Sequence, residues 1–107
     1  MNFISQPFLE KKKLLIVFGT RPEALKCFPV ARAALARPDL VTEICVTAQH
    51  REMVDQVIKL TGMPVHYDLD AMRPGQSLFD VTNKVLVGME TVLEQSKPDI
   101  VMVQGDT

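Results

Sequence analysis

The sequence lacks tryptophan and is poor in cysteine, with two cysteines, Cys27 and Cys45, among 107 residues. Both lie alone in apolar stretches without a CxxC pair, which argues against a zinc site. An isolated cysteine of this kind commonly behaves as a small buried hydrophobe. We therefore expect two reduced thiols and a cytoplasmic location rather than a disulfide-stabilised secreted domain.

A strong charge of one sign is also missing, because the formal net charge is -1 at pH 7. Without a basic field, neither nucleic acid nor an anionic membrane is an expected partner. No apolar run approaches the roughly 20 residues of a transmembrane helix, and the start of the chain does not resemble a secretory signal. We interpret residues 1–12 as a flexible N-terminal extension and residues 13–107 as one domain, cut short.

Several nucleotide and metal motifs are absent. No GxGxxG follows the first apolar run and no acidic residue ends the second, so NAD binding is not expected. The sequence also contains no GxxxxGK[ST], HExxH or EF-hand loop, which excludes a P-loop nucleotidase and two common metal sites. We predict no cofactor and no metal.

Short apolar runs bounded by polar or turn residues are present four times. They occupy residues 13–18, 43–47, 65–69 and 99–104. Their shortness and their content of β-branched residues favour buried strands over helices. The third run is the weakest of the four, and its His66 has a structural role as its first interpretation.

Helical spacing of apolar residues fills the segments between these runs. The first helix carries Pro22 at its start, a favoured position. It also carries Pro29, which removes a backbone donor, so we predict a kink or break there. Gly62 closes the second helix, and Ser77 with Asp80 caps the start of the third.

The alternation β-α-β-α-β-α-β predicts an α/β fold, a parallel sheet with helices on both faces. The usual strand order of such a Rossmann-like half-fold is 3-2-1-4, and its ligands bind beyond the carboxyl ends of the strands, at the switch point between strands 1 and 4. Arg21 follows strand 1 and Asp106 follows strand 4. We therefore expect these two side chains to face one crevice.

The residue types around this crevice suit an anionic sugar substrate. Gly19 permits a close backbone approach or a tight turn, and the start of the first helix offers N–H groups to phosphate. Arg21 supplies a planar fork of donors, and Lys26 a second positive charge. Asp106 is placed to act as a general acid or base, or to orient a sugar hydroxyl.

Each of these residues also has a structural interpretation. An arginine after a strand is often solvated or paired locally, here with Glu23 or Asp106, and a helical lysine such as Lys26 is usually solvated. His50 ends strand 2 on the ligand side of the sheet. It is therefore a further candidate, and its position alone does not distinguish a functional from a structural role.

Longer stretches of the chain resemble one family. The sequence FGTRPEALK at residues 18–26 resembles the FGTRPEAIK opening of the non-hydrolysing UDP-N-acetylglucosamine 2-epimerases. TAQHREM at residues 47–53 resembles the start of their TAQHREMLDQ segment, and PGQ at 74–76 and GDT at 105–107 fall at the family's spacing. The resemblance covers about residues 13–107.

This resemblance implies a glycosyltransferase-B-like protein of two Rossmann-like domains, of which the chain is the first half of the N-terminal domain. Family members interconvert UDP-N-acetylglucosamine and UDP-N-acetylmannosamine. They do so by eliminating UDP, forming a 2-acetamidoglucal, and adding UDP back, without nicotinamide. The product feeds bacterial surface polysaccharides. A homodimer is the assembly that the family implies for the full-length protein.

Carried over by motif, Arg21 and Lys26 resemble active-site cations near the diphosphate and sugar, and Asp106 resembles a catalytic carboxylate. The remaining substrate-binding candidates are Gly19, Thr20, Gln49, His50 and Gly105. Among these, Gln49 resembles a contact to the second, activating sugar nucleotide that some members bind. Two alternatives stay open, a non-catalytic sugar-nucleotide-binding module and a related UDP-sugar hydrolase. The 107-residue chain by itself is predicted to be inactive.

Overall fold

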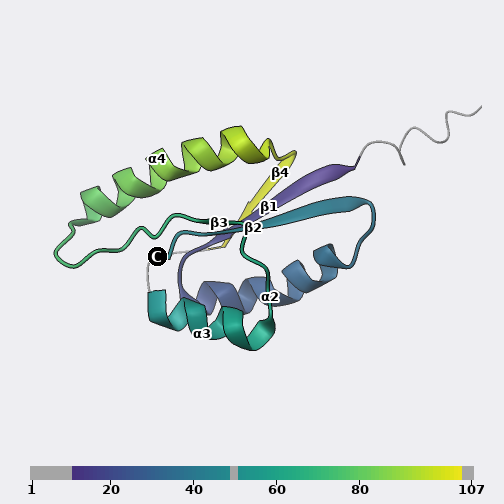
Figure 1. Ribbon diagram of the computed structural model, residues 1–107, viewed down its shortest axis with the longest axis horizontal. Coiled ribbons are helices and arrows are strands. Elements are labelled where there is room, and N and C mark those ends of the chain that lie inside the picture. Colours follow the sequence, from purple (N-terminus) through teal and green to yellow (C-terminus); the bar gives the residue numbers. More distant parts are fainter. Residues whose placement is uncertain (1–10, 49–50, 105–107) are drawn as a thin grey trace, which may run out of the picture.

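In the computed structural model, the chain folds into a parallel sheet whose strands alternate with helices. The structure describes residues 11–48 and 51–104. The strands are β1 (Lys12–Phe18), β2 (Leu40–Val46), β3 (Tyr67–Asp68) and β4 (Ile100–Val103), and the helices are α2 (Arg21–Leu35), α3 (Arg51–Thr61) and α4 (Leu78–Ser96) (Figure 1). All pairings are parallel and the strand order is β3-β2-β1-β4. The predicted α/β class and the order 3-2-1-4 are therefore confirmed.

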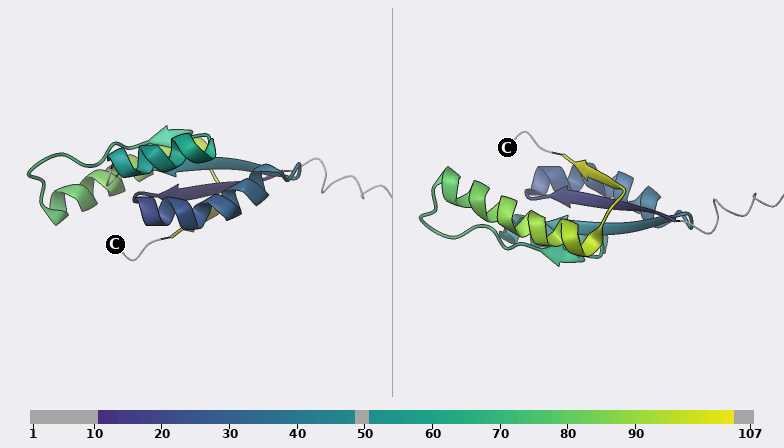
Figure 2. Two further views of the ribbon diagram at one scale, coloured as in Figure 1. Left: turned by 90° about the horizontal axis from the view of Figure 1, so that it is seen from below. Right: turned by 90° about the horizontal axis from the view of Figure 1, so that it is seen from above.

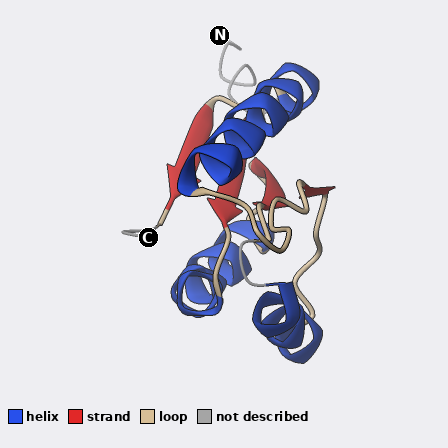
Figure 3. Cartoon of the chain, turned by 90° about the vertical axis from the view of Figure 1, so that its left-hand side faces the viewer, coloured by secondary structure: helices blue, strands red, loops and turns tan. Residues whose placement is uncertain are grey.

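Helices cover both faces of this sheet. Figures 2 and 3 show α2 and α3 side by side on one face and α4 on the other. Ile16 and Phe18 of β1 point into the core under α2 and α3, whereas Leu15 and Val17 point towards α4 and its Val92. Because β1 is buried on both faces, its sequence is a continuous apolar run instead of an alternating one.

The third strand is shorter than predicted, with two residues in place of 65–69. A side chain takes part of its place beside β2. The N–H of Ile44 donates to Nδ1 of His66 over 3.0 Å, while the N–H of His66 donates to the carbonyl of Ile44 over 2.9 Å. His66 thus replaces one rung of the ladder, and its expected structural role is confirmed.

A kink or break was predicted at Pro29; the break is wrong, because α2 runs without interruption from Arg21 to Leu35, and the kink stays a prediction. Both Pro29 and Leu25, whose carbonyl loses its helical donor, are exposed. The unpaired carbonyl therefore lies on the solvent side of the helix, where water can bind it. The opposite face packs on the sheet through Ala24 and Ala31, both fully buried.

The predicted helix ends are confirmed. At the start of α4, the N–H of Ser77 donates to the Asp80 carboxylate over 3.0 Å, and the N–H of Asp80 donates to the Ser77 hydroxyl over 3.1 Å. Gly62 ends α3 with a φ of 71°, and its N–H donates to the carbonyl of Ile58. A positive φ is a conformation that glycine adopts without steric cost.

Lys97 ends α4 in the same left-handed region, with φ 50° and ψ 57°, although it carries a Cβ. Replacing Lys97 with glycine is expected to stabilise the full-length protein by about 0.5–1 kcal/mol, because the steric strain at Cβ disappears. A rise in the melting temperature measures this gain. Lys59→Gly, inside α3, is the opposite control and is expected to lower it.

Candidate functional site

The carboxyl ends of β1 and β4 lie next to each other. The two strands pair in parallel, with Val17 opposite Val103. The turn of residues 19–21 that follows β1 therefore starts beside Gln104, which follows β4. This adjacency is the switch point expected from the sequence. Gly105 and Asp106 lie outside the described residues, so the meeting of Arg21 and Asp106 stays a prediction.

A buried carboxylate organises the turn after β1. Oε1 of Glu23 accepts the backbone N–H of Gly19 over 2.8 Å and that of Thr20 over 3.1 Å. Glu23 itself is 6% exposed. These two amides precede the first turn of α2 and already have an acceptor, whereas contacts of that turn's N–H groups with phosphate, and of Gly19 or Thr20 with substrate, stay predictions. The φ of Gly19 is not positive, so a left-handed turn is not its purpose.

Arg21 and Lys26 both extend from α2 into solvent. Within residues 11–48 and 51–104, neither side chain forms a salt bridge, so the local pairing of Arg21 with Glu23 is not observed. Five residues turn a helix by about 140° and advance it by about 7.5 Å. The two cations therefore leave α2 in different directions, and their long side chains must bend towards each other for one ligand to contact both.

Two buried polar atoms at this edge of the sheet have no hydrogen-bond partner among the described residues. They are Oγ1 of Thr20, on a residue that is 3% exposed, and Oε1 of Gln104. Thr20 and Glu23 have the arrangement of a capping box, but the Thr20 side chain forms no capping hydrogen bond in it. A buried polar atom without a partner destabilises the fold unless a ligand or water binds it. Their position at the ends of β1 and β4 therefore supports a ligand site there.

The end of β2 shows backbone strain. Ala48, which is fully buried, has a φ of 64°. A residue with a Cβ adopts this conformation at a cost of roughly 1–2 kcal/mol. Such strain often accompanies functional sites. The candidates Gln49 and His50 come next in the chain and lie outside the described residues, so their roles stay predictions.

Sequence reasoning missed Glu23 and Ala48. The motif T-x-x-E at residues 20–23 is a capping-box signal that could have indicated the Glu23 contact. No comparable signal exists for Ala48, because alanine is not a residue typical of positive φ. Glu23 also affects Cys27 one turn later on α2. Burial, and secondarily the charge of Glu23, raise the pKa of the Cys27 thiol.

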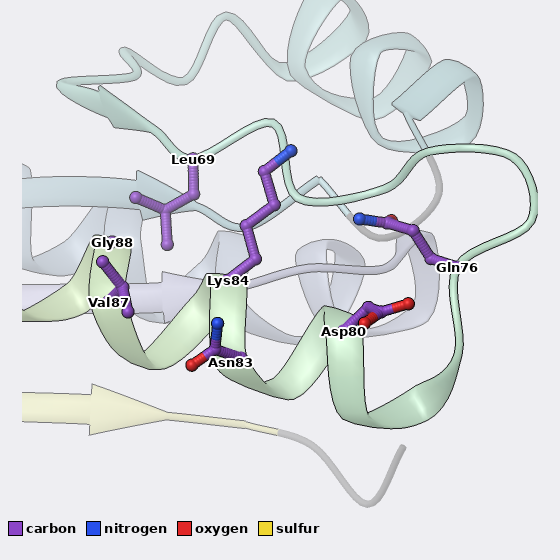
Figure 4. Close-up of a pocket in the computed structure, with 7 residues that line it drawn as sticks. All are labelled: Leu69, Gln76, Asp80, Asn83, Lys84, Val87 and Gly88. Carbon is purple, nitrogen blue, oxygen red and sulfur yellow. The ribbon is translucent and has the colours of Figure 1, made fainter.

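A hollow of about 560 Å³ lies on the opposite face, between α4 and the segment that leads to it (Figure 4). Its apolar lining is Leu69, Val87 and Gly88, and its polar lining is Gln76, Asp80, Asn83 and Lys84. A Cβ on Gly88 would lie 2.8 Å from the Leu69 side chain, so glycine permits the close approach of α4 here. Of the candidates that the structure describes, namely Gly19, Thr20, Arg21 and Lys26, none lines this hollow.

The described ranges hold neither a candidate metal site nor a candidate membrane span. No group of three or more histidine, cysteine, aspartate or glutamate side chains there could hold a metal ion. No helix there has the length and apolar character needed to cross a bilayer. Cys27 and Cys45 are both buried and free, as expected.

Comparison with protein families gives one match. The model described as UDP-N-acetylglucosamine 2-epimerase matches residues 32–107. The probable UDP-N-acetylglucosamine 2-epimerase of Ralstonia solanacearum is 52% identical over 96 residues, which are 90% of this chain and 26% of that protein. The UDP-N-acetylglucosamine 2-epimerase of Escherichia coli K12 is 50% identical over 95 residues, or 89% of this chain and 25% of that protein.

Solved structures agree with this match. The epimerase from Neisseria meningitidis, solved bound to UDP-N-acetylglucosamine, superposes with a TM-score of 0.80 at 47% identity, covering 89% of this chain and 26% of that one. A putative UDP-N-acetylglucosamine 2-epimerase from Listeria monocytogenes superposes with a TM-score of 0.85 at 42% identity, covering 92% and 26%. The chain therefore spans about a quarter of the length of the relatives it matches.

Proposed function

Because the chain belongs to the UDP-N-acetylglucosamine 2-epimerase family, we propose that the full-length protein interconverts UDP-N-acetylglucosamine and UDP-N-acetylmannosamine. The observation that supports this most directly is the position of Arg21. It is an exposed cation on the turn after β1, next to the end of β4, where sheets of this kind bind ligands.

The reaction proceeds by elimination and re-addition. A carboxylate removes the proton from C2 of the sugar, the C2–H electrons form the C1=C2 double bond, and the C1–O bond to UDP breaks. The oxygen of the departing UDP takes the electrons of that bond. A proton then returns to C2 from the other face and UDP adds back to C1, so that the configuration at C2 is inverted. The carbon skeleton undergoes no net oxidation, so no nicotinamide is required.

The residues of this chain suit the charges that develop. UDP gains negative charge as it departs, and a fixed cation next to the diphosphate lowers the energy of that state. We assign this role to Arg21 and, from the other side of α2, to Lys26. Asp106 is the proposed base or acid, a role that needs a carboxylate within hydrogen-bond reach of the sugar. Gly19, Thr20, Gln49, His50 and Gly105 complete the proposed substrate contacts.

Proton NMR of the full-length protein with UDP-N-acetylglucosamine tests this function. The expected result is the growth of UDP-N-acetylmannosamine signals to a constant ratio with the substrate. Release of free N-acetylmannosamine with UDP would instead identify a UDP-sugar hydrolase. Binding of the substrate without any change in its signals would identify a non-catalytic binding module. Either of these results contradicts the epimerase proposal.

The 107-residue chain alone is expected to show no turnover, because a cleft between two domains cannot form from part of one. Epimerisation by the purified chain in the same NMR assay would refute this. For the full-length protein we further propose a homodimer, which light scattering would report as twice the chain mass. We also propose a cytoplasmic location, which the two free cysteines support.

A further inference from the structure

Glu23 occupies the position in which the fold would otherwise present backbone donors to an anion. Its Oε1 receives the N–H groups of both Gly19 and Thr20, at 2.8 and 3.1 Å, and the side chain is buried beneath the turn. An anion at the N-terminus of a helix usually binds such N–H groups. Here the protein supplies its own carboxylate for two of them.

The groups of this turn therefore fall into two sets, those that hydrogen-bond within the protein and those that remain available to a ligand. The two amides that Glu23 holds already have an acceptor, whereas the Thr20 hydroxyl is buried without a partner and the Arg21 guanidinium is exposed and unpaired within the described residues. The groups of this turn that remain for a ligand are therefore the Thr20 and Arg21 side chains and the backbone N–H of Arg21. Their direction depends on the backbone of residues 19–21, which the carboxylate fixes at two consecutive amides.

We propose that Glu23 is a positioning residue for the epimerase reaction. By holding the Gly19 and Thr20 amides, it sets the direction of the Thr20 hydroxyl and the Arg21 guanidinium at the substrate diphosphate. The contribution that this proposal concerns is the reach of its acceptor oxygen, because both groups that donate to it are neutral backbone N–H groups. This inference rests on the proposed function.

A second glutamate offers a matched control. Glu43, in β2, also accepts hydrogen bonds with its Oε1, over 2.6 Å from the Ser96 hydroxyl and 3.4 Å from the Tyr67 hydroxyl, and it is 3.8 Å from Nζ of Lys13. Its side chain is 19% exposed. The network joins β2 to the C-terminal end of α4, away from the turn at residues 19–21. Changes at Glu43 therefore disturb the fold without touching that turn.

Two substitutions of Glu23 distinguish the effect of the reach of its acceptor oxygen from the effect of its negative charge. Glu23→Asp keeps the charge but withdraws the carboxylate by one methylene, so it cannot reach both amides from the same helix position. Glu23→Gln removes the charge but keeps an acceptor oxygen at the same reach. Glu43→Asp and Glu43→Gln are the controls. All four are made in the full-length protein, and kcat, KM, the affinity for UDP by calorimetry and the melting temperature are measured.

We expect Glu23→Asp to lower kcat/KM about tenfold or more and to weaken UDP binding, because a small displacement of a positioning group has a large effect on rate. Glu23→Gln is expected to stay within about threefold of wild type. The Glu43 variants are expected to lower the melting temperature by about as much as the Glu23 variants do. Their kcat/KM at 25 °C is nevertheless expected to stay within about threefold of wild type.

Two results would overturn the inference. One is a Glu23→Gln variant as defective as Glu23→Asp, which would assign the effect to charge. The other is a loss of activity that follows the melting temperature equally at positions 23 and 43. If the wild-type protein binds UDP but does not epimerise, the proposed reaction fails, and the UDP affinities of the same variants decide the role of Glu23. A wild-type protein that does not bind UDP would refute both proposals.

Discussion

Replacement of Arg21 with alanine in the full-length protein is expected to lower kcat/KM for UDP-N-acetylglucosamine by about a hundredfold or more. Removing one group that stabilises developing charge typically has an effect of this size. Arg21 is exposed on the first residue of α2, and no salt bridge within the described ranges neutralises it. Its charge is therefore directed at solvent or ligand and not at the fold.

Arg32→Ala is the matched control, because Arg32 is also an exposed arginine of α2 but lies in its last turn. The control is expected to retain wild-type kinetics and a similar melting temperature. Arg21→Lys is expected to recover part of the lost activity, since lysine keeps the charge but not the planar fork of donors. Equal kinetics for Arg21→Ala and Arg32→Ala would remove Arg21 from the site.

Asp106→Asn is expected to reduce kcat by about a thousandfold, within the range typical of the loss of a general acid or base. Asparagine has nearly the same shape as aspartate but does not accept a proton at neutral pH. The prediction concerns a residue outside the described part of the structure. It relies on the pairing of β1 with β4, which places Gln104 next to the turn that carries Arg21, and on the expectation that Asp106 follows at the same edge.

Asp99→Asn is its control at the other end of β4. There the Asp99 carboxylate accepts the backbone N–H of Lys13 over 2.7 Å, a bond that an asparagine oxygen can also accept. The control variant should keep its kcat. In the full-length protein, the pH dependence of kcat should lose one of its limbs in Asp106→Asn only. An unchanged pH profile with a small loss of kcat would mean that Asp106 orients the substrate and does not transfer the proton.

Much of the fold was predictable because its signals are local. The continuous apolar run of β1 indicates a strand buried on both faces, and the alternation of strands with helices restricts the sheet to few topologies. The capping residues Ser77 and Asp80 marked the start of α4 correctly, because a capping box depends on neighbouring backbone atoms. The expected ligand edge followed from the strand order alone.

The predictions were wrong where the tertiary surroundings of a residue overrode a local sequence rule. Pro29 does not break α2, because the carbonyl that loses its donor is on the exposed side and the buried face continues across it. β3 is short because the His66 side chain accepts the hydrogen bond that a longer strand would take. Neither outcome follows from propensity, since each depends on which side of an element faces the core.

The sequence by itself determined the fold class, the strand order and the edge of the sheet where Arg21 lies, because apolar periodicity and turn residues act over a few neighbouring positions. Only the tertiary structure decided how the turn after β1 uses its groups. Burial of Glu23 places its carboxylate on the Gly19 and Thr20 amides and leaves the Thr20 hydroxyl without a partner. The pairing of hydrogen-bond donors with acceptors depends on distances between packed elements, and these distances are set only in the folded chain.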